Sequence, residues 1–178
     1  FTVWDTGIGI APADQARLLG LKSKLAIHNA RLAYAAWQEV IWNSPRFAKL
    51  NVIASMQPTH ATSDMPWAQD RVGPERIVGA YAWRQLRDSG ARLALGSDFP
   101  VEQVDPRLGL AAAVTRADGD GKPVGGWFPG EKLTAFEALR GFTLDAAHAG
   151  FAEAEVGSLV AGKRADFVVL AEDPLAVP

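Results

Sequence analysis

The stretch RLALGSDFPVE, residues 92–102, decides the fold that this sequence predicts. It begins with a short apolar run, which Gly96-Ser97 ends. A strand over residues 92–95 would deliver Asp98 to the edge of a sheet, with Glu102 following on the same loop. The carboxyl ends of buried parallel strands are where α/β enzymes place their chemistry. The alternative is an aspartate that only caps a turn before a proline.

Composition restricts the class of protein. The 178 residues are 48% hydrophobic and 21% charged, which suits a packed globular core rather than a disordered chain. A net charge of −2 offers no basic surface for nucleic acid. The absence of cysteine excludes disulfides, thiolate metal sites and a cysteine nucleophile. Because no apolar run approaches the ~20 residues of a membrane span and no signal-peptide pattern is found, we expect a cytoplasmic protein that does not bind membranes.

The first 44 residues differ in character from the rest, and their fold stays open. Residues 1–10 read as a strand that runs into a glycine turn, and residues 14–41 have the periodicity of a helix. The motif DTGIGI, residues 5–10, resembles an ATP-contacting box of sensor histidine kinases. The other two elements of such a site are absent, so an ATP-binding module is a minor alternative. His28 is interpreted as an ordinary helix residue, with a metal ligand as the second interpretation.

After a junction near residue 45, the pattern of strand, polar loop and helix begins. Residues 51–55 predict a strand, followed by a loop with a polar and aromatic cluster that suits a substrate pocket or, alternatively, a plain surface loop. This cluster comprises His60, Asp64, Met65, Trp67 and Asp70. Gly73-Pro74-Glu75 predicts the start of a helix that Gly90 ends, before the strand of residues 92–95. The order predicts the repeating βα unit of a parallel α/β fold.

The C-terminal part predicts more helices and then a change to strands. A short helix over residues 106–115 precedes a turn-rich loop that carries Trp127. Thr134 and Glu137 form a capping box that starts a helix through residue 142. A shorter helix over residues 145–151 contains His148, interpreted as structural. Two strands in hairpin-like order, at residues 156–160 and 165–170, predict a small additional sheet.

Four segments in this order resemble the amidohydrolase superfamily, in the branch of YtcJ-like metal-dependent hydrolases (amidohydrolase family 3). They are SMQPTHATSDMPWAQDRVGPERI (55–77), AYAWRQLRDSGARLALGSDFPVE (80–102), GGWFPGEKLT (125–134) and VGSLVAGKRADFVVLAEDPL (156–175). Together they place the resemblance over residues 45–178.

The resemblance implies both a fold and a site. The fold would be the C-terminal part of a (β/α)8 barrel of the TIM type in residues 45–152, plus strands of a small β-sandwich in residues 153–178. Asp98 would be catalytic, binding a divalent metal, zinc, and taking a proton from the attacking water. The implied substrate-binding residues are His60, Asp64, Trp67 and Trp127. The implied activity is hydrolysis of non-peptide C–N bonds in a small-molecule substrate.

The sequence also departs from the family's ligand set. The His-x-His pair of the first barrel strand is absent, and the histidines of the middle strands are missing unless His28 stands in for one. A catalytic zinc usually takes three protein ligands, and Asp98 is the one convincing candidate. We therefore expect a fragment with impaired activity. The alternative is a non-catalytic remnant, or one that folds only as a homo-oligomer because an incomplete barrel leaves strand edges uncovered.

Overall fold

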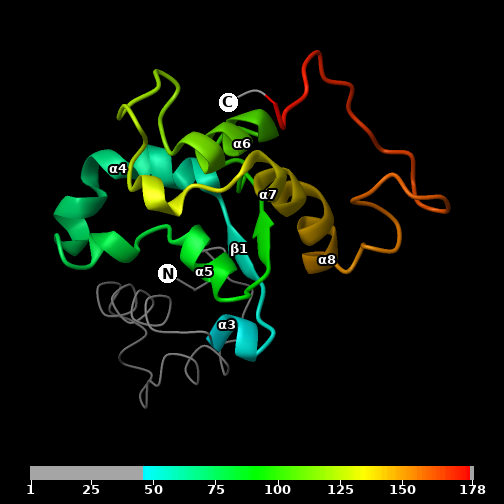
Figure 1. Ribbon diagram of the computed structural model, residues 1–178, viewed down its shortest axis with the longest axis horizontal. Helices are drawn as coiled ribbons and strands as arrows, with labels where there is room; N and C mark the ends of the chain where they lie inside the picture. Colours follow the sequence, from blue (N-terminus) through cyan, green and yellow to red (C-terminus); the bar gives the residue numbers. More distant parts are fainter. Residues whose placement is uncertain (1–45, 177–178) are drawn as a thin grey trace.

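The computed structural model describes residues 46–176, so the predicted N-terminal segment, with DTGIGI and His28, lies outside the described residues. Its centre is a parallel pair of strands, β1 (Ala54–Met56) and β2 (Leu93–Leu95), shown side by side in Figure 1. Ala54 is opposite Leu93 in the register. The predicted parallel pairing is confirmed, although β1 begins later than the predicted strand at residues 51–55.

A helix, not a loop, follows β1. The short helix α3 (Arg46–Lys49) precedes the strand, and α4 (Pro58–Val72) begins directly after it. The prediction of a polar loop at this place was therefore wrong. Pro58 suits the first helical position, where its missing N–H is not needed, and the helix buries only a narrow stripe that includes Ala61 and Ala68. Because these buried residues are small and Pro66 interrupts the pattern, the sequence gives a weak helical signal here.

The return from α4 to β2 is shorter in helix than predicted. A 3₁₀ turn, η3 (Ile77–Gly79), comes first, and α5 (Trp83–Asp88) begins only after Tyr81. The backbone of Tyr81 has φ +54, a left-handed conformation that ends any helix running through it. One continuous helix from residue 73 was therefore the wrong prediction. Gly90, with φ +90, ends the helical segment as predicted.

The remaining helices follow the predicted boundaries closely. The predicted helix at residues 106–115 is α6 (Pro106–Thr115), and η4 (Pro129–Glu131) ends the loop that follows it. The capping box is present at α7 (Ala135–Arg140), which continues through a π-helical turn, η5 (Gly141–Asp145), into α8 (Ala146–Ala149). Among the described residues, no helix is both long and apolar enough to cross a membrane.

The sheet is locked to these helices at the start of β2. Arg92, which precedes the strand, donates to the carboxylate of Asp145 at 2.8 Å, and Arg140 donates to the other carboxylate oxygen at 3.1 Å. Gly141 lies against Leu95, and a Cβ on Gly141 would come 2.7 Å from that side chain. Only glycine therefore allows η5 to approach the strand this closely.

The segment after α8 differs from the prediction. No strand is formed at residues 156–160 or 165–170, and Figure 1 shows the chain after α8 as a segment without helix or strand. Val168 and Val169 are more than 80% exposed, at 81% and 84%. A lone two-stranded hairpin is marginal in water, and no described strand offers a third partner. The strands of a small β-sandwich are thus not found among the described residues.

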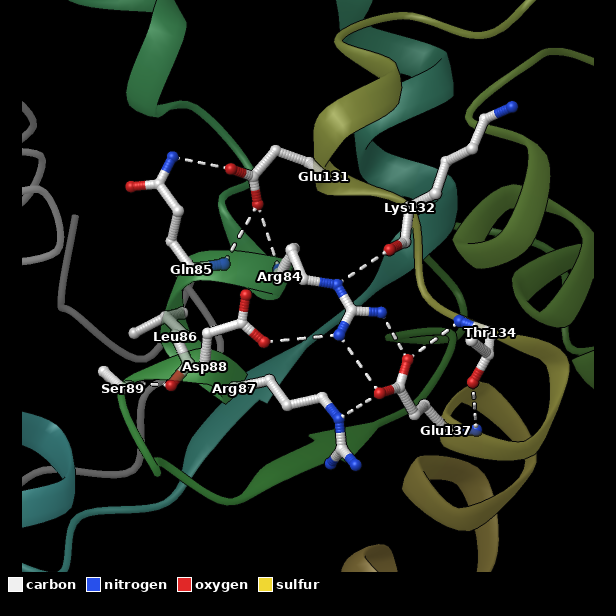
Figure 2. Close-up of polar contacts among 10 residues, drawn as sticks. All are labelled: Arg84, Gln85, Leu86, Arg87, Asp88, Ser89, Glu131, Lys132, Thr134 and Glu137. Carbon is white, nitrogen blue, oxygen red and sulfur yellow. Dashed lines mark hydrogen bonds and ion pairs between the residues drawn. The ribbon is translucent and has the colours of Figure 1, made fainter.

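A network of charged groups joins α5 to α7 and the loop before it (Figure 2). Glu137 accepts from the guanidinium groups of Arg84 and Arg87, and Arg84 Nε also donates to the carbonyl of Lys132 at 3.0 Å. Glu131 accepts from the backbone N–H groups of Arg84 and Gln85 in the first turn of α5, at 3.0 and 3.3 Å. The bonds from Arg84 hold the pKa of Glu137 well below its ordinary value of 4.5.

We predict that Glu137→Gln lowers the free energy of unfolding near pH 7 by about 2 kcal/mol, since it removes charge-assisted bonds in a partly buried network. Because the pKa of Glu137 is lower in the folded state than its ordinary value of 4.5, Glu137 stabilises the fold above pH 4.5. This stabilisation is lost as the pH falls further. Urea unfolding at several pH values should show the two chains converging as the solution becomes acidic. Glu75→Gln, at an exposed acid, is the control. A gap that stays constant with pH would contradict the prediction.

Candidate functional site

Asp98 and His60 meet at one edge of the parallel pair. Asp98 lies in the turn after β2, and His60 lies in the first turn of α4, which follows β1. The atoms His60 Nε2 and Asp98 Oδ2 are 3.9 Å apart. His60 Nε2 is buried and has no hydrogen-bond partner among the described residues, so it is available to another group. Asp98 has φ +55, a left-handed conformation that aspartate tolerates better than most residues.

Asp64 joins the same site one helical turn after His60. Residues at i and i+4 lie on one face of a helix, so both side chains leave α4 on the same side. The phenol of Tyr81 donates a short hydrogen bond to Asp64 Oδ2. Burial raises the pKa of Asp64 above its ordinary value, against the lowering effects of the Tyr81 hydrogen bond and the charge of His60, while Glu102 adds to the rise.

The two tryptophans predicted to bind substrate come from different elements, a helix and a loop. Trp67 follows Asp64 on α4 at a spacing that keeps it on that face, and it is 48% exposed. Trp127 comes from the loop after α6, and its ring centroid lies 5.8 Å from that of Tyr81. Trp127 is therefore connected to the site by the contact of its ring with the Tyr81 ring. His148, interpreted as structural, lies in α8 with Nδ1 3.0 Å from a carboxylate oxygen of Glu153.

The donors described so far fall short of a metal site. Within residues 46–176, no group of three or more histidine, aspartate or glutamate side chains could hold a metal ion. Asp98 and His60 offer two donor side chains, whereas a catalytic zinc takes three from the protein. The described residues therefore do not fit the group by themselves. The prediction of Asp98 as a metal ligand, with partners found elsewhere, stays a prediction.

A sequence profile described as "Amidohydrolase family" matches residues 42–178. The chain belongs to the amidohydrolase family. The predicted resemblance is thereby confirmed, and hydrolysis is the chemistry of the family. The chain matches its relatives over only a part of their length.

Three relatives define the likeness. YtcJ of Bacillus subtilis (strain 168), whose name assigns it to the amidohydrolases, is 36% identical over 132 residues, which are 74% of this chain and 25% of YtcJ. The N-substituted formamide deformylase of Arthrobacter pascens is 41% identical over 92 residues, 52% of this chain and 16% of the enzyme. An uncharacterized metal-dependent hydrolase from Pyrococcus furiosus superposes with a TM-score of 0.62 at 34% identity, over 73% of this chain and 25% of that structure. The amidohydrolase chain thus spans about a quarter of the length of YtcJ.

Sequence reasoning missed two residues of the candidate site. Tyr81 lies within the segment predicted as one helix from Gly73 to Gly90, but its left-handed backbone turns the phenol toward Asp64. Arg116, at the end of α6, received no role, although its buried guanidinium contacts the backbone of Tyr81. Tyr81 lies in the quoted segment 80–102, and Arg116 lies in none of the four quoted segments. Only a three-dimensional structure brings positions 64, 81 and 116 together.

We predict that Tyr81→Phe raises the pKa of Asp64 further, because the phenol bond favours the charged carboxylate and burial remains. NMR of the Asp64 carboxyl carbon across a pH series measures this directly. Phe128→Leu is the matched control, since it changes a ring that packs on Trp127 without removing the hydroxyl. An unchanged or lowered pKa of Asp64 in Tyr81→Phe would show that the phenol does not bond to this carboxylate in solution.

Proposed function

We propose that the chain is a part of a metal-dependent hydrolase that cleaves C–N bonds of non-peptide amides in small molecules, and that these residues alone have impaired activity. Membership of the amidohydrolase family supports hydrolysis. The name of the Arthrobacter pascens relative, an N-substituted formamide deformylase, supports the choice of bond. The length of that relative and of YtcJ, well beyond the matched region, supports the impairment.

The observation that carries the proposal is the approach of Asp98 to His60 at the carboxyl ends of β1 and β2. These two side chains come from different βα units, 38 positions apart in the sequence, and the parallel pairing brings them to 3.9 Å. A carboxylate beside an imidazole nitrogen that has no hydrogen-bond partner among the described residues can accept and transfer protons. The carboxyl ends of the strands are also where α/β enzymes bind substrates.

Each residue has a stated part in the proposed reaction. Asp98 takes a proton from the attacking water and delivers it to the leaving nitrogen. His60 Nε2, which has no hydrogen-bond partner among the described residues, donates to the substrate carbonyl oxygen in the tautomer that carries a proton on this nitrogen. Asp64, held by Tyr81, accepts an N–H of the substrate. Trp67 and Trp127 contribute apolar surface at the mouth of the site.

The proposal includes a divalent metal, zinc, with Asp98 as one ligand and the other donors outside residues 46–176. A bound zinc ion would supply a Lewis acid and lower the pKa of a water molecule toward ~7. A non-catalytic remnant is the second candidate, and the short donor set among the described residues favours it.

A chimera tests the proposed function. We predict that the Arthrobacter pascens deformylase keeps activity on N-substituted formamides when residues 42–178 of this chain replace its corresponding region, because the two regions would supply equivalent parts of one site. In that chimera, Asp98→Asn should lower kcat by about 100-fold or more, since the amide cannot accept the proton. Asp118→Asn, in an exposed loop, is the control.

Two outcomes would contradict this prediction. A folded, metal-loaded chimera without deformylase activity would favour the non-catalytic remnant. An Asp98→Asn chimera as active as its parent would remove Asp98 from the reaction. The isolated chain is expected to bind zinc weakly and to hydrolyse no N-formyl or N-acyl substrate, so tight binding of one zinc with turnover would overturn the proposed impairment.

A further inference from the structure

Arg116 is the most deeply buried charged side chain among the described residues, with an exposed fraction of 0%. Its guanidinium carbon lies 4.3 Å from the ring centroid of Trp83 and 5.3 Å from that of Trp127. Burial lowers the pKa of Arg116 to about 10, so it stays protonated at neutral pH. A buried cation is costly unless its donors are used and its charge is compensated. Two aromatic faces and the nearby charge of Glu131 supply part of that compensation.

Two donors of Arg116 are used on backbone carbonyls of the candidate site, while the buried Nη2 has no hydrogen-bond partner among the described residues. Nη1 donates to the carbonyl of Tyr81 at 3.0 Å, and Nε donates to the carbonyl of Trp127. Trp127 returns a bond, because its N–H donates to the carbonyl of Arg116 at 2.7 Å. One planar guanidinium therefore joins the end of α6, the turn at Tyr81 and the loop that carries Trp127.

The turn at Tyr81 needs such a restraint. A residue with a side chain at φ +54 is strained, and it keeps this conformation only where its surroundings enforce it. The carbonyl of Tyr81 accepts from the N–H of Trp83 at 2.9 Å as well as from Arg116. The left-handed turn is also what separates η3 from α5 and lets the phenol donate to Asp64.

The loop of Trp127 is fitted to Arg116 with equal closeness. Gly126 has φ +87, and a Cβ there would lie 2.2 Å from the carbonyl oxygen of Thr115 and 3.3 Å from Cβ of Arg116. The loop therefore passes directly over the end of α6, and only glycine permits this approach. Trp127 then packs its ring against Tyr81.

We infer that Arg116 is a positioning residue of the candidate site, whose guanidinium holds the Tyr81 and Trp127 carbonyls together and so keeps the Tyr81 phenol on Asp64. Arg116 acts through Tyr81, because within residues 46–176 its guanidinium makes no hydrogen bond to Asp64. The inference rests on the proposed function in taking Asp64 and Trp127 as substrate contacts. The coupling of Arg116 to Asp64 stands on the geometry.

The first test follows the carboxyl carbon of Asp64 by NMR in the 178-residue chain. Arg116→Lys keeps a positive charge but cannot donate from one planar group to two carbonyls. We predict that it shifts the titration of Asp64 to higher pH, as Tyr81→Phe does, because the phenol is no longer held in place. With Tyr81→Phe already present, Arg116→Lys should add no further shift, since the path is already broken. The charged groups around Asp64, His60 and Glu102, are unchanged in every variant.

A folded Arg116→Lys chain in which Asp64 titrates as in the unmodified chain would overturn the inference. Additive shifts in the double variant would overturn it too, because a residue that only stabilises the fold has no reason to act through the phenol. Arg107→Lys is the matched control, since Arg107 pairs with Asp105 at the exposed start of α6.

A second measurement leaves Arg116 in place, so it does not depend on whether Arg116→Lys folds. The Nε resonance of Arg116 in the unmodified chain should move as Asp64 titrates, and this movement should disappear in Asp64→Asn. If the chemical shift of Arg116 Nε does not change as Asp64 titrates, the inference is overturned, even where Arg116→Lys unfolds. Neither measurement uses a substrate or a metal, so their failure leaves the deformylase chimera to decide the proposed function separately.

Discussion

The parallel pairing of β1 with β2 is the constraint on which the site depends. Parallel strands end at the same edge of a sheet, so the residues that follow each strand must meet there. The first turn of α4 and the turn at Asp98 are brought together by this pairing, although they lie far apart along the chain. Residues next to α5, which precedes β2, and next to α6, which follows it, stabilise the site at this edge of the sheet. Tyr81 precedes α5, and Arg116 ends α6.

The molecule compensates its buried charges in two distinct ways. Between α5 and α7, Glu137 meets two guanidinium groups of opposite charge: Arg84 donates two bonds to the carboxylate, and Arg87 donates one from Nε. Beneath the site, Arg116 meets no carboxylate in direct contact among the described residues and relies on backbone carbonyls and tryptophan faces. The second arrangement leaves the carboxylates of the site unpaired by arginine. Neither Asp64 nor Asp98 is therefore occupied by a guanidinium group among the described residues.

The parts of this structure that could be predicted from the sequence have local causes. Thr134 and Glu137 form their capping box within four residues, and the apolar run ended by Gly96 predicts β2 and the exposed Asp98. Helix α4 was missed because its buried stripe is built from small residues, which carry little hydrophobic periodicity. Tyr81 and Arg116 were missed for a deeper reason. Their roles depend on carbonyls and aromatic faces supplied by other segments, and no spacing in the sequence encodes such contacts.

The attachment of β2 to η5 separates two tasks along a single strand. Arg92 and Asp145 fasten the strand at its beginning, while Asp98 follows its end. Substitutions around Asp98 can therefore alter which molecules are accommodated without loosening the fastening, and substitutions at Asp145 would weaken the scaffold whatever the substrate. During evolution, the residues around Asp98 can therefore change while the Arg92–Asp145 pair that attaches the strand is kept.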